Sequence, residues 1–143
     1  MKILFICFAN VCRSYAAEKI MQKLRPSDEC FSRGIYANPD FSVPQKMLDF
    51  LKAEGFADEE HIPARLTKED MEAADYIFFM EEEHYELLAE RWSQFLNKMY
   101  LLAEFAEEKK KNIEDPISLH GRAFAKSMAK LKDIVNKAAE LLP

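Results

Sequence analysis

Short apolar segments alternate with amphipathic segments along the chain. The apolar segments are rich in β-branched and aromatic residues, and they predict strands over residues 2–7, 30–34, 75–80 and 98–102. The first of them, KILFIC, is apolar at every position after Lys2. This pattern is typical of a strand that is buried on both faces of a parallel sheet.

The segments between the strands have the apolar spacing of amphipathic helices, with intervals of three and four residues. The first helix begins near Ser14 and ends at Pro26. Thr67 and Asp70 form a capping-box pattern that opens a later helix. The predicted helices cover residues 14–25, 43–51 and 67–74, a segment that begins at about 82, and residues 124–142.

Strands and helices alternate over the whole length, which is typical of a parallel sheet with right-handed crossovers. We therefore expect an α/β fold with a four-stranded parallel sheet and helices on both faces. The length of 143 residues is close to that of one domain, so we expect a single domain over residues 1–143. The charged run at 107–111 predicts a solvated, mobile loop.

Charge and hydropathy exclude two classes of function. The formal net charge is −5, and no basic segment could form the surface that a nucleic-acid-binding protein needs. No apolar stretch approaches 18 residues, so we expect no insertion into a membrane. The apolar run that ends at Ala9 is too short for a signal peptide, because Asn10 and Arg13 follow it directly.

The cysteines point to a reducing compartment. There are three, an odd number, and they form neither a metal-binding motif nor a complete set of disulfides. Reduced thiols and a cytoplasmic location are therefore expected. The pattern predicts no metal site and no cofactor, and it specifies no oligomeric state.

The candidate chemistry lies between the first strand and the first helix, where open α/β sheets bind ligands. A loop of this length can turn its backbone N–H groups toward one phosphate-sized anion, and the helix N-terminus adds a partial positive charge. The segment has the pattern C-x5-R-S and reads Cys7, Phe8, Ala9, Asn10, Val11, Cys12, Arg13, Ser14. We expect a phosphate-binding loop that consists of these residues.

Four side chains of the loop have distinct expected roles. Arg13 carries a planar fork that can bind two phosphate oxygens. The positive field of the loop favours the thiolate form of Cys7, which makes its sulfur the candidate nucleophile. Ser14 can donate its hydroxyl hydrogen to that thiolate, and Asn10 tolerates the left-handed backbone that a tight loop requires.

With these residues the chain resembles the low-molecular-weight protein-tyrosine phosphatases, whose loop reads roughly C-x-G-N-x-C-R-S-P. The resemblance continues through Ser32-x-Gly34, residues 64–70, 75–80 and 101–105, and Asp115-Pro116. It implies a four-stranded parallel sheet and hydrolysis through a cysteinyl-phosphate, without metal or cofactor. The implied substrate is a phosphotyrosine-containing protein or a small aryl phosphate.

By this resemblance Asp115 is the general acid, on a loop before the last helix. Cleavage of a phosphate ester needs such an acid to protonate the leaving oxygen. The alternative is that Asp115-Pro116 only shapes the turn into the last helix, as Asp-Pro often does.

The chain departs from the family pattern at several positions. Ala9 replaces a glycine, and Tyr15 replaces the proline after Arg-Ser. No aromatic residue follows Asp115-Pro116, where the family often has a wall of the substrate slot. Tyr36 and Phe41 are candidates for the other wall, with Tyr36 favoured. No catalytic role is assigned to the histidines, which are His61, His84 and His120.

Three alternatives stay open. Arsenate reductases of this fold need further cysteines beyond the third strand, and residues 78–95 contain none. Arginine phosphatases resemble this family with a threonine at the position of Val11, and valine lacks that hydroxyl. Ala9 and Tyr15 would also fit a weakly active module that binds phosphorylated ligands, although binding alone needs neither a nucleophile nor an acid.

Overall fold

A sheet of four parallel strands lies at the centre of the computed structural model, which describes residues 1–143. The strands are arranged in the order β2-β1-β3-β4, and all neighbours run in the same direction. Their bounds are β1 (Lys2–Cys7), β2 (Glu29–Gly34), β3 (Tyr76–Phe79) and β4 (Met99–Leu101). The predicted fold class is confirmed.

The fourth strand is shorter than the predicted segment 98–102. Lys98 ends a 3-10 helix and Leu102 begins a short α-helix, so only three residues pair with β3. Sequence pattern alone does not distinguish a strand from a 3-10 helix or an α-helix here, because residues 99–102 are all apolar or aromatic.

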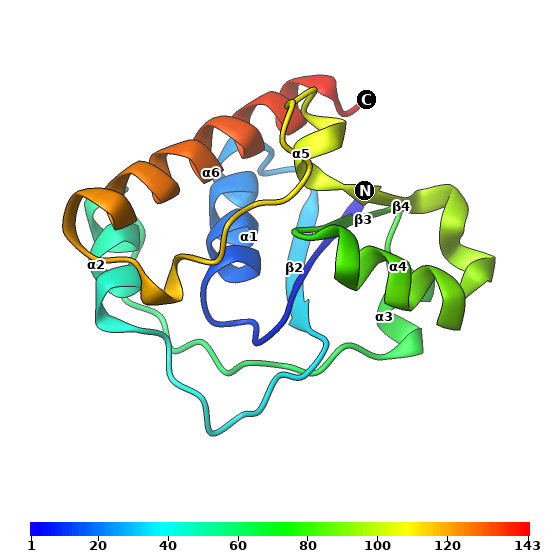
Figure 1. Cartoon of the computed structure of the whole chain (residues 1–143), viewed down its shortest axis with the longest axis horizontal. Helices are drawn as coiled ribbons and strands as arrows, with labels where there is room; N and C mark the ends of the chain where they lie inside the picture. The colour runs from blue at the N-terminus through cyan, green and yellow to red at the C-terminus, as the bar shows by residue number, and fades with distance from the viewer.

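Helices cover both faces of the sheet (Figure 1). One face carries α1 (Arg13–Leu24), α2 (Gln45–Ala53), α5 (Leu102–Phe105) and α6 (Gly121–Leu141). The other carries α3 (Lys68–Ala73), α4 (Glu82–Arg91) and η1 (Ser93–Lys98). A short 3-10 helix, η2 (Pro116–Ser118), precedes α6. None of the helices combines the length and the apolar composition that crossing a membrane would require.

β1 divides the core into two parts, because successive side chains of a strand point to opposite faces. Ile3 and Phe5 belong to the cluster on the side of α1 and α6, whereas Leu4 and Ile6 belong to the cluster on the side of α3 and α4. All four side chains are fully buried. The uninterrupted apolar pattern of the first strand thus reflects a central strand that is covered on both faces.

Two local predictions have different outcomes. The capping box is confirmed: the Thr67 hydroxyl accepts a hydrogen bond from the Asp70 N–H, and the Asp70 carboxylate accepts one from the Thr67 N–H. The charged run at 107–111 is largely exposed, as predicted, and its mobility stays a prediction. Glu107 and Glu108 form ion pairs with lysines of α6, at 4.0 and 2.8 Å.

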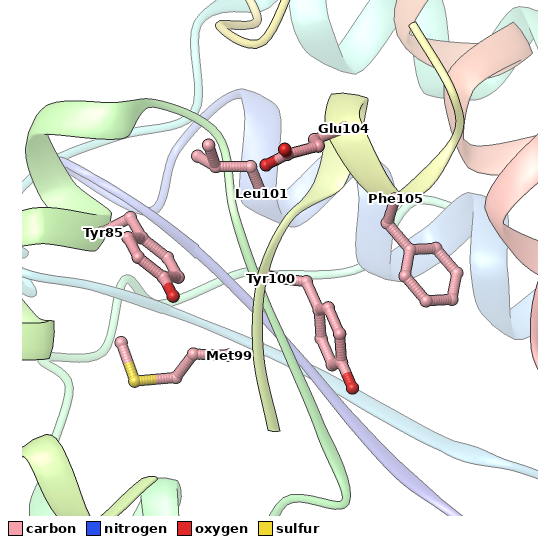
Figure 2. A pocket seen from close by; sticks show the side chains of 6 residues that line it. All are labelled: Tyr85, Met99, Tyr100, Leu101, Glu104 and Phe105. Atoms are coloured by element: carbon pink, nitrogen blue, oxygen red, sulfur yellow. The ribbon is translucent and has the colours of Figure 1, made fainter. Parts of the chain in front are cut away.

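The edge strand β4 borders a shallow hollow of about 210 Å³ (Figure 2). Tyr100 and Phe105 lie on one side of the strand, and Tyr85 and Met99 lie on the other. None of the lining residues belongs to the loop of residues 7–14. The loop between β1 and α1 lies elsewhere, at the lower ends of β1 and β2 in Figure 1.

Candidate active site

β1 ends at Cys7 and α1 begins at Arg13, so residues 8–12 form a tight loop at the carboxyl end of the central strand. The Cys7 side chain is 3% exposed, and Ser14 is fully buried. No side chain caps the first turn of α1. The N–H groups of this first turn have no side-chain acceptor, and the positive end of α1 lies at the loop. Both features favour binding of an anion there.

The sulfur of Cys7 lies among hydrogen-bond donors. Its Sγ is 2.9 Å from the Ser14 Oγ, and the backbone N–H of Asn10 donates to it over 3.3 Å. A thiolate at this position would accept both hydrogen bonds. The loop thus stabilises negative charge on the sulfur that the sequence identifies as the candidate nucleophile.

Asn10 connects the loop to the rest of the fold. Its φ of 62° is in the left-handed region, as predicted, and its side chain is fully buried. The Nδ2 atom donates to the Ser14 and Ser32 hydroxyls over 2.9 Å each, and Oδ1 accepts from the Ala64 N–H over 3.0 Å. Every hydrogen-bonding atom of this amide therefore contributes to the shape of the loop.

The substitution of the family glycine by Ala9 does not strain the loop. Positive φ occurs at Asn10 and not at Ala9. The close approach of backbone occurs instead at Gly34, where a Cβ atom would lie 2.8 Å from the Phe8 carbonyl oxygen and 2.9 Å from the Ala9 carbonyl carbon. Glycine is required at the end of β2 rather than within the loop.

Tyr15, which replaces the family proline, supports the loop through a histidine. Its ring stacks on His61 with centroids 3.8 Å apart, and the His61 Nε2 is 2.7 Å from the Asn10 carbonyl oxygen. Burial lowers the pKa of His61 and raises the pKa of the Tyr15 hydroxyl, so both are neutral near pH 7. The two departures from the family loop are thus accommodated by packing.

Arg13 is held by two segments that are distant from it in the sequence. Its Nη1 donates to the Ile113 carbonyl over 2.8 Å and lies 3.4 Å from the Glu81 Oε2. Its Nη2 lies 3.6 Å from the Asp115 Oδ2. With only 3% of its side chain exposed, the guanidinium has one orientation, which is set before any phosphate binds.

Glu81 is a site residue that sequence reasoning missed. It directly follows Met80 at the carboxyl end of β3, and its Oε2 also lies 3.5 Å from the Nδ1 of buried His84. Burial lowers the pKa of His84, against the opposing charge of Glu81. An acidic residue directly after a buried parallel strand is the signal that could have identified it.

Asp115 lies at the entrance of the site and is 46% exposed. Its Oδ1 accepts a hydrogen bond from the Ile117 N–H over 3.1 Å, which caps η2, while its Oδ2 faces Arg13. The side chain therefore shapes the turn and also reaches the loop. The two interpretations of Asp115 are physically compatible.

Aromatic side chains border the loop on the side of β2. The exposed rings of Phe8 and Tyr36 lie 5.1 Å apart, and the Phe8 ring is 6.0 Å from His84. The structure thus brings Tyr36 to the loop, together with Phe8, which was predicted only as a loop residue. Phe41 is 44% exposed and pairs with no other ring, so nothing places it against the site.

Cys12 and Cys30 are buried free thiols, as is Cys7. Burial raises the pKa of Cys12 to about 12, with a further contribution from the negative charge of Asp115. Burial also raises the pKa of Cys30 to about 12. No group of three or more His, Cys, Asp or Glu side chains is arranged to hold a metal ion.

Comparison with known proteins gives consistent results. The family described as low molecular weight phosphotyrosine protein phosphatase matches residues 2–142. A low molecular weight protein-tyrosine-phosphatase PtpB of Staphylococcus aureus is 29% identical over 142 residues, which cover 99% of both chains. A protein-arginine-phosphatase of Geobacillus stearothermophilus is 28% identical over 144 residues, covering 99% of this chain and 95% of the relative.

Solved structures agree with the sequence matches. The low molecular weight protein tyrosine phosphatase from T. tengcongensis superimposes with a TM-score of 0.91 at 27% identity, covering 99% of both chains. The YwlE arginine phosphatase from Geobacillus stearothermophilus gives 0.88 at 25% identity, covering 97% of this chain and 90% of that structure. This chain is therefore a member of the low-molecular-weight phosphotyrosine protein phosphatase family.

Proposed function

We propose that this protein hydrolyses phosphotyrosine and small aryl phosphates through a cysteinyl-phosphate intermediate. The observation that carries the proposal is the place of the Cys7 sulfur, which accepts a hydrogen bond from the Asn10 N–H and lies beside the Ser14 hydroxyl. Binding of phosphate needs no nucleophile at this position, whereas covalent catalysis does.

In the first step, the Cys7 thiolate attacks phosphorus in line with the leaving oxygen. The S–P bond forms as the bond between phosphorus and the phenolic oxygen breaks. Arg13 and the loop N–H groups hold the three equatorial oxygens, which carry the developing charge. Asp115, at the entrance, donates its proton to the leaving phenolate.

In the second step, the Asp115 carboxylate accepts a proton from a water molecule. The water oxygen attacks phosphorus, the S–P bond breaks, and inorganic phosphate forms. The sulfur leaves as a thiolate, which the Ser14 hydroxyl and the Asn10 N–H stabilise by hydrogen bonds. The phosphate ester and one water molecule are the only reactants that the two steps consume.

Phosphoarginine is the second candidate substrate, because some relatives are named protein-arginine-phosphatases. A phosphoarginine site must bind a guanidinium group, which hydrogen-bonding side chains in the loop would favour. Val11 is buried and offers no such group, whereas the rings of Phe8 and Tyr36 suit an aromatic substrate. These observations favour phosphotyrosine.

The experiment that tests the proposal compares two peptides of one sequence, phosphorylated on tyrosine or on arginine. We expect kcat/KM to be higher for the phosphotyrosine peptide by at least tenfold. Cys7→Ser is the control for contaminating activity. A higher kcat/KM for phosphoarginine would replace phosphotyrosine by phosphoarginine as the substrate.

The three free thiols also support a reducing, cytoplasmic setting, in which phosphorylated proteins are available as substrates. Separation of cell fractions with an antibody against the protein tests the location.

A further inference from the structure

A groove of about 260 Å³ lies between the loop after β2, the segment before α3, and α4. Six of its eight lining residues are hydrophobic, and they include the half-exposed side chains of Tyr36 and Leu87. Two arginines, Arg65 and Arg91, also line it. The groove therefore combines hydrophobic side chains with two positive charges.

The groove begins at the active-site loop. Tyr36, one of its lining residues, has its ring centre 5.1 Å from that of Phe8 in the loop, and its N–H donates to the Phe8 carbonyl over 3.0 Å. On α4, His84 lies near Phe8, and the lining residues Leu88 and Arg91 follow it at intervals of four and three on the same face of the helix. From His84 to Arg91 the helix rises about 10 Å.

The two arginines of the groove have no acidic partners, and Arg122 on α6 is the one other arginine of the chain without an ion pair. Arg13, Arg25 and Arg33 each form an ion pair with a carboxylate. Neither Arg65 nor Arg91 has an ion pair or a side-chain hydrogen bond. Instead, the Arg65 guanidinium lies 5.8 Å from the ring centre of Tyr36, and that of Arg91 lies 4.8 Å from the ring centre of Trp92.

Stacking on an aromatic ring restrains a guanidinium but leaves its N–H groups free at the edge. Those donors are arranged to bind carboxylates bidentately. The chain has 25 acidic and 20 basic residues, and none of its own carboxylates pairs with Arg65 or Arg91. The free donors are therefore available to an external acidic ligand.

We propose that this groove binds an acidic segment of the protein substrate next to its phosphorylated residue. One substrate carboxylate binds Arg65, close to the active site, and a second binds Arg91, farther along α4. An extended chain advances about 3.3 Å per residue, so the rise of about 10 Å from His84 to Arg91 corresponds to about three residues of an extended substrate. The proposal rests on the proposed function, because it assumes a phosphorylated protein substrate.

The test uses two phosphotyrosine peptides that differ only at the three residues on each side of the phosphotyrosine, Glu in one and Gln in the other. Their Kd values are measured with the full-length Cys7→Ser protein by fluorescence anisotropy. We expect the Glu peptide to bind at least fivefold more tightly, and less so at high salt. Arg65→Gln and Arg91→Gln are then introduced separately into the Cys7→Ser protein. Each should reduce the logarithm of the ratio of the two Kd values by at least half.

Lys126→Gln is the matched control. It removes one positive charge from an exposed position of α6, on the other face of the sheet. We expect it to keep the preference for the Glu peptide. Equal Kd values for the two peptides, or an equal loss in the Lys126 variant, would overturn the proposal. Because binding is measured on Cys7→Ser protein, a failure of hydrolysis by the wild type would disprove the proposed function and leave the result for the groove unaffected.

Discussion

The guanidinium of Arg13 and the carboxylate of Asp115 face each other across the candidate active site, with Nη2 and Oδ2 3.6 Å apart. A bound phosphate would compete with Asp115 for Nη2, because Nη1 already donates to the Ile113 carbonyl and lies near Glu81. Substrate binding would therefore release Asp115 from this ion pair. A carboxyl group freed in this way can hold the proton that the leaving group needs.

Asp115→Asn is predicted to slow hydrolysis of substrates with poor leaving groups most strongly. The expected loss of kcat is about 100-fold to 10000-fold for phosphotyrosine, and less for nitrophenyl phosphate, because an activated leaving group needs less protonation. The affinity for inorganic phosphate should stay the same or rise, since a negative charge near a dianion is removed. Kinetics with both substrates test this prediction. Equal losses with a lowered melting temperature would mean that Asp115 only caps η2.

Cys7→Ser is predicted to abolish hydrolysis and to retain binding of phosphate or vanadate. The neutral hydroxyl is a much weaker nucleophile than a thiolate, whereas Arg13 and the loop N–H groups still bind the anion. Activity with nitrophenyl phosphate and calorimetric binding of vanadate measure the two properties. Residual activity above about 1% of the wild-type value would contradict the assignment of the nucleophile.

Asn10→Ala is predicted to lower the free energy of unfolding by about 2 kcal/mol or more, and to reduce activity. The variant loses the hydrogen bonds to Ser14, Ser32 and Ala64, and alanine is strained at a φ of 62°. Urea denaturation measures the effect. Asn10→Gly separates the two causes, because glycine accepts the backbone conformation but lacks the amide. If Asn10→Gly were as stable as the wild type, the hydrogen bonds would not be the cause.

Peroxide is predicted to inactivate the enzyme by forming a Cys7–Cys12 disulfide, which dithiothreitol reduces. Cys7 is the candidate thiolate, and Cys12 lies at the other end of the same loop. Because the pKa of Cys12 is about 12, its thiolate is scarce at pH 7, and disulfide formation should become faster as pH rises from 7 to 10. Mass spectrometry of the oxidised protein identifies the pair. Finding Cys7 linked to Cys30, or only as sulfinic acid, would refute the pairing.

The protein is predicted to lose stability as pH falls from about 7.5 to 5.5. Burial lowers the pKa of His61 and His84 in the folded state. In the unfolded state the two imidazoles regain the ordinary histidine pKa of about 6.5, so the unfolded state binds more protons as pH falls through this value. Unfolding is therefore favoured as pH falls through this range. Urea denaturation at both pH values measures the slope, which His84→Gln should reduce and exposed His120→Gln should not. An unchanged slope in His84→Gln would disprove this origin.

Local pattern was sufficient for most of the secondary structure. The uninterrupted apolar run 2–7 predicted a central strand because burial on both faces removes the need for polar positions. The capping box at Thr67 was predictable because its two hydrogen bonds join residues only three positions apart. The limits of β4 were not predictable, since strand, 3-10 helix and α-helix meet within one apolar segment.

The sequence by itself determined the family, the α/β class and the loop that joins Cys7 to Arg13, because those depend on neighbours in the chain. Only the tertiary structure decided which distant groups meet at that loop. Glu81 reaches Arg13 because parallel strands bring their carboxyl ends to one edge of the sheet. Asp115 reaches Arg13 because its segment is joined to the end of β3, where the Ile113 N–H donates to the Met80 carbonyl. The Tyr36 ring lies against the loop residue Phe8, whereas the Phe41 ring pairs with no other ring, although both side chains are aromatic and about half exposed. Contacts of this kind depend on the path of the chain in space, which local periodicity does not encode.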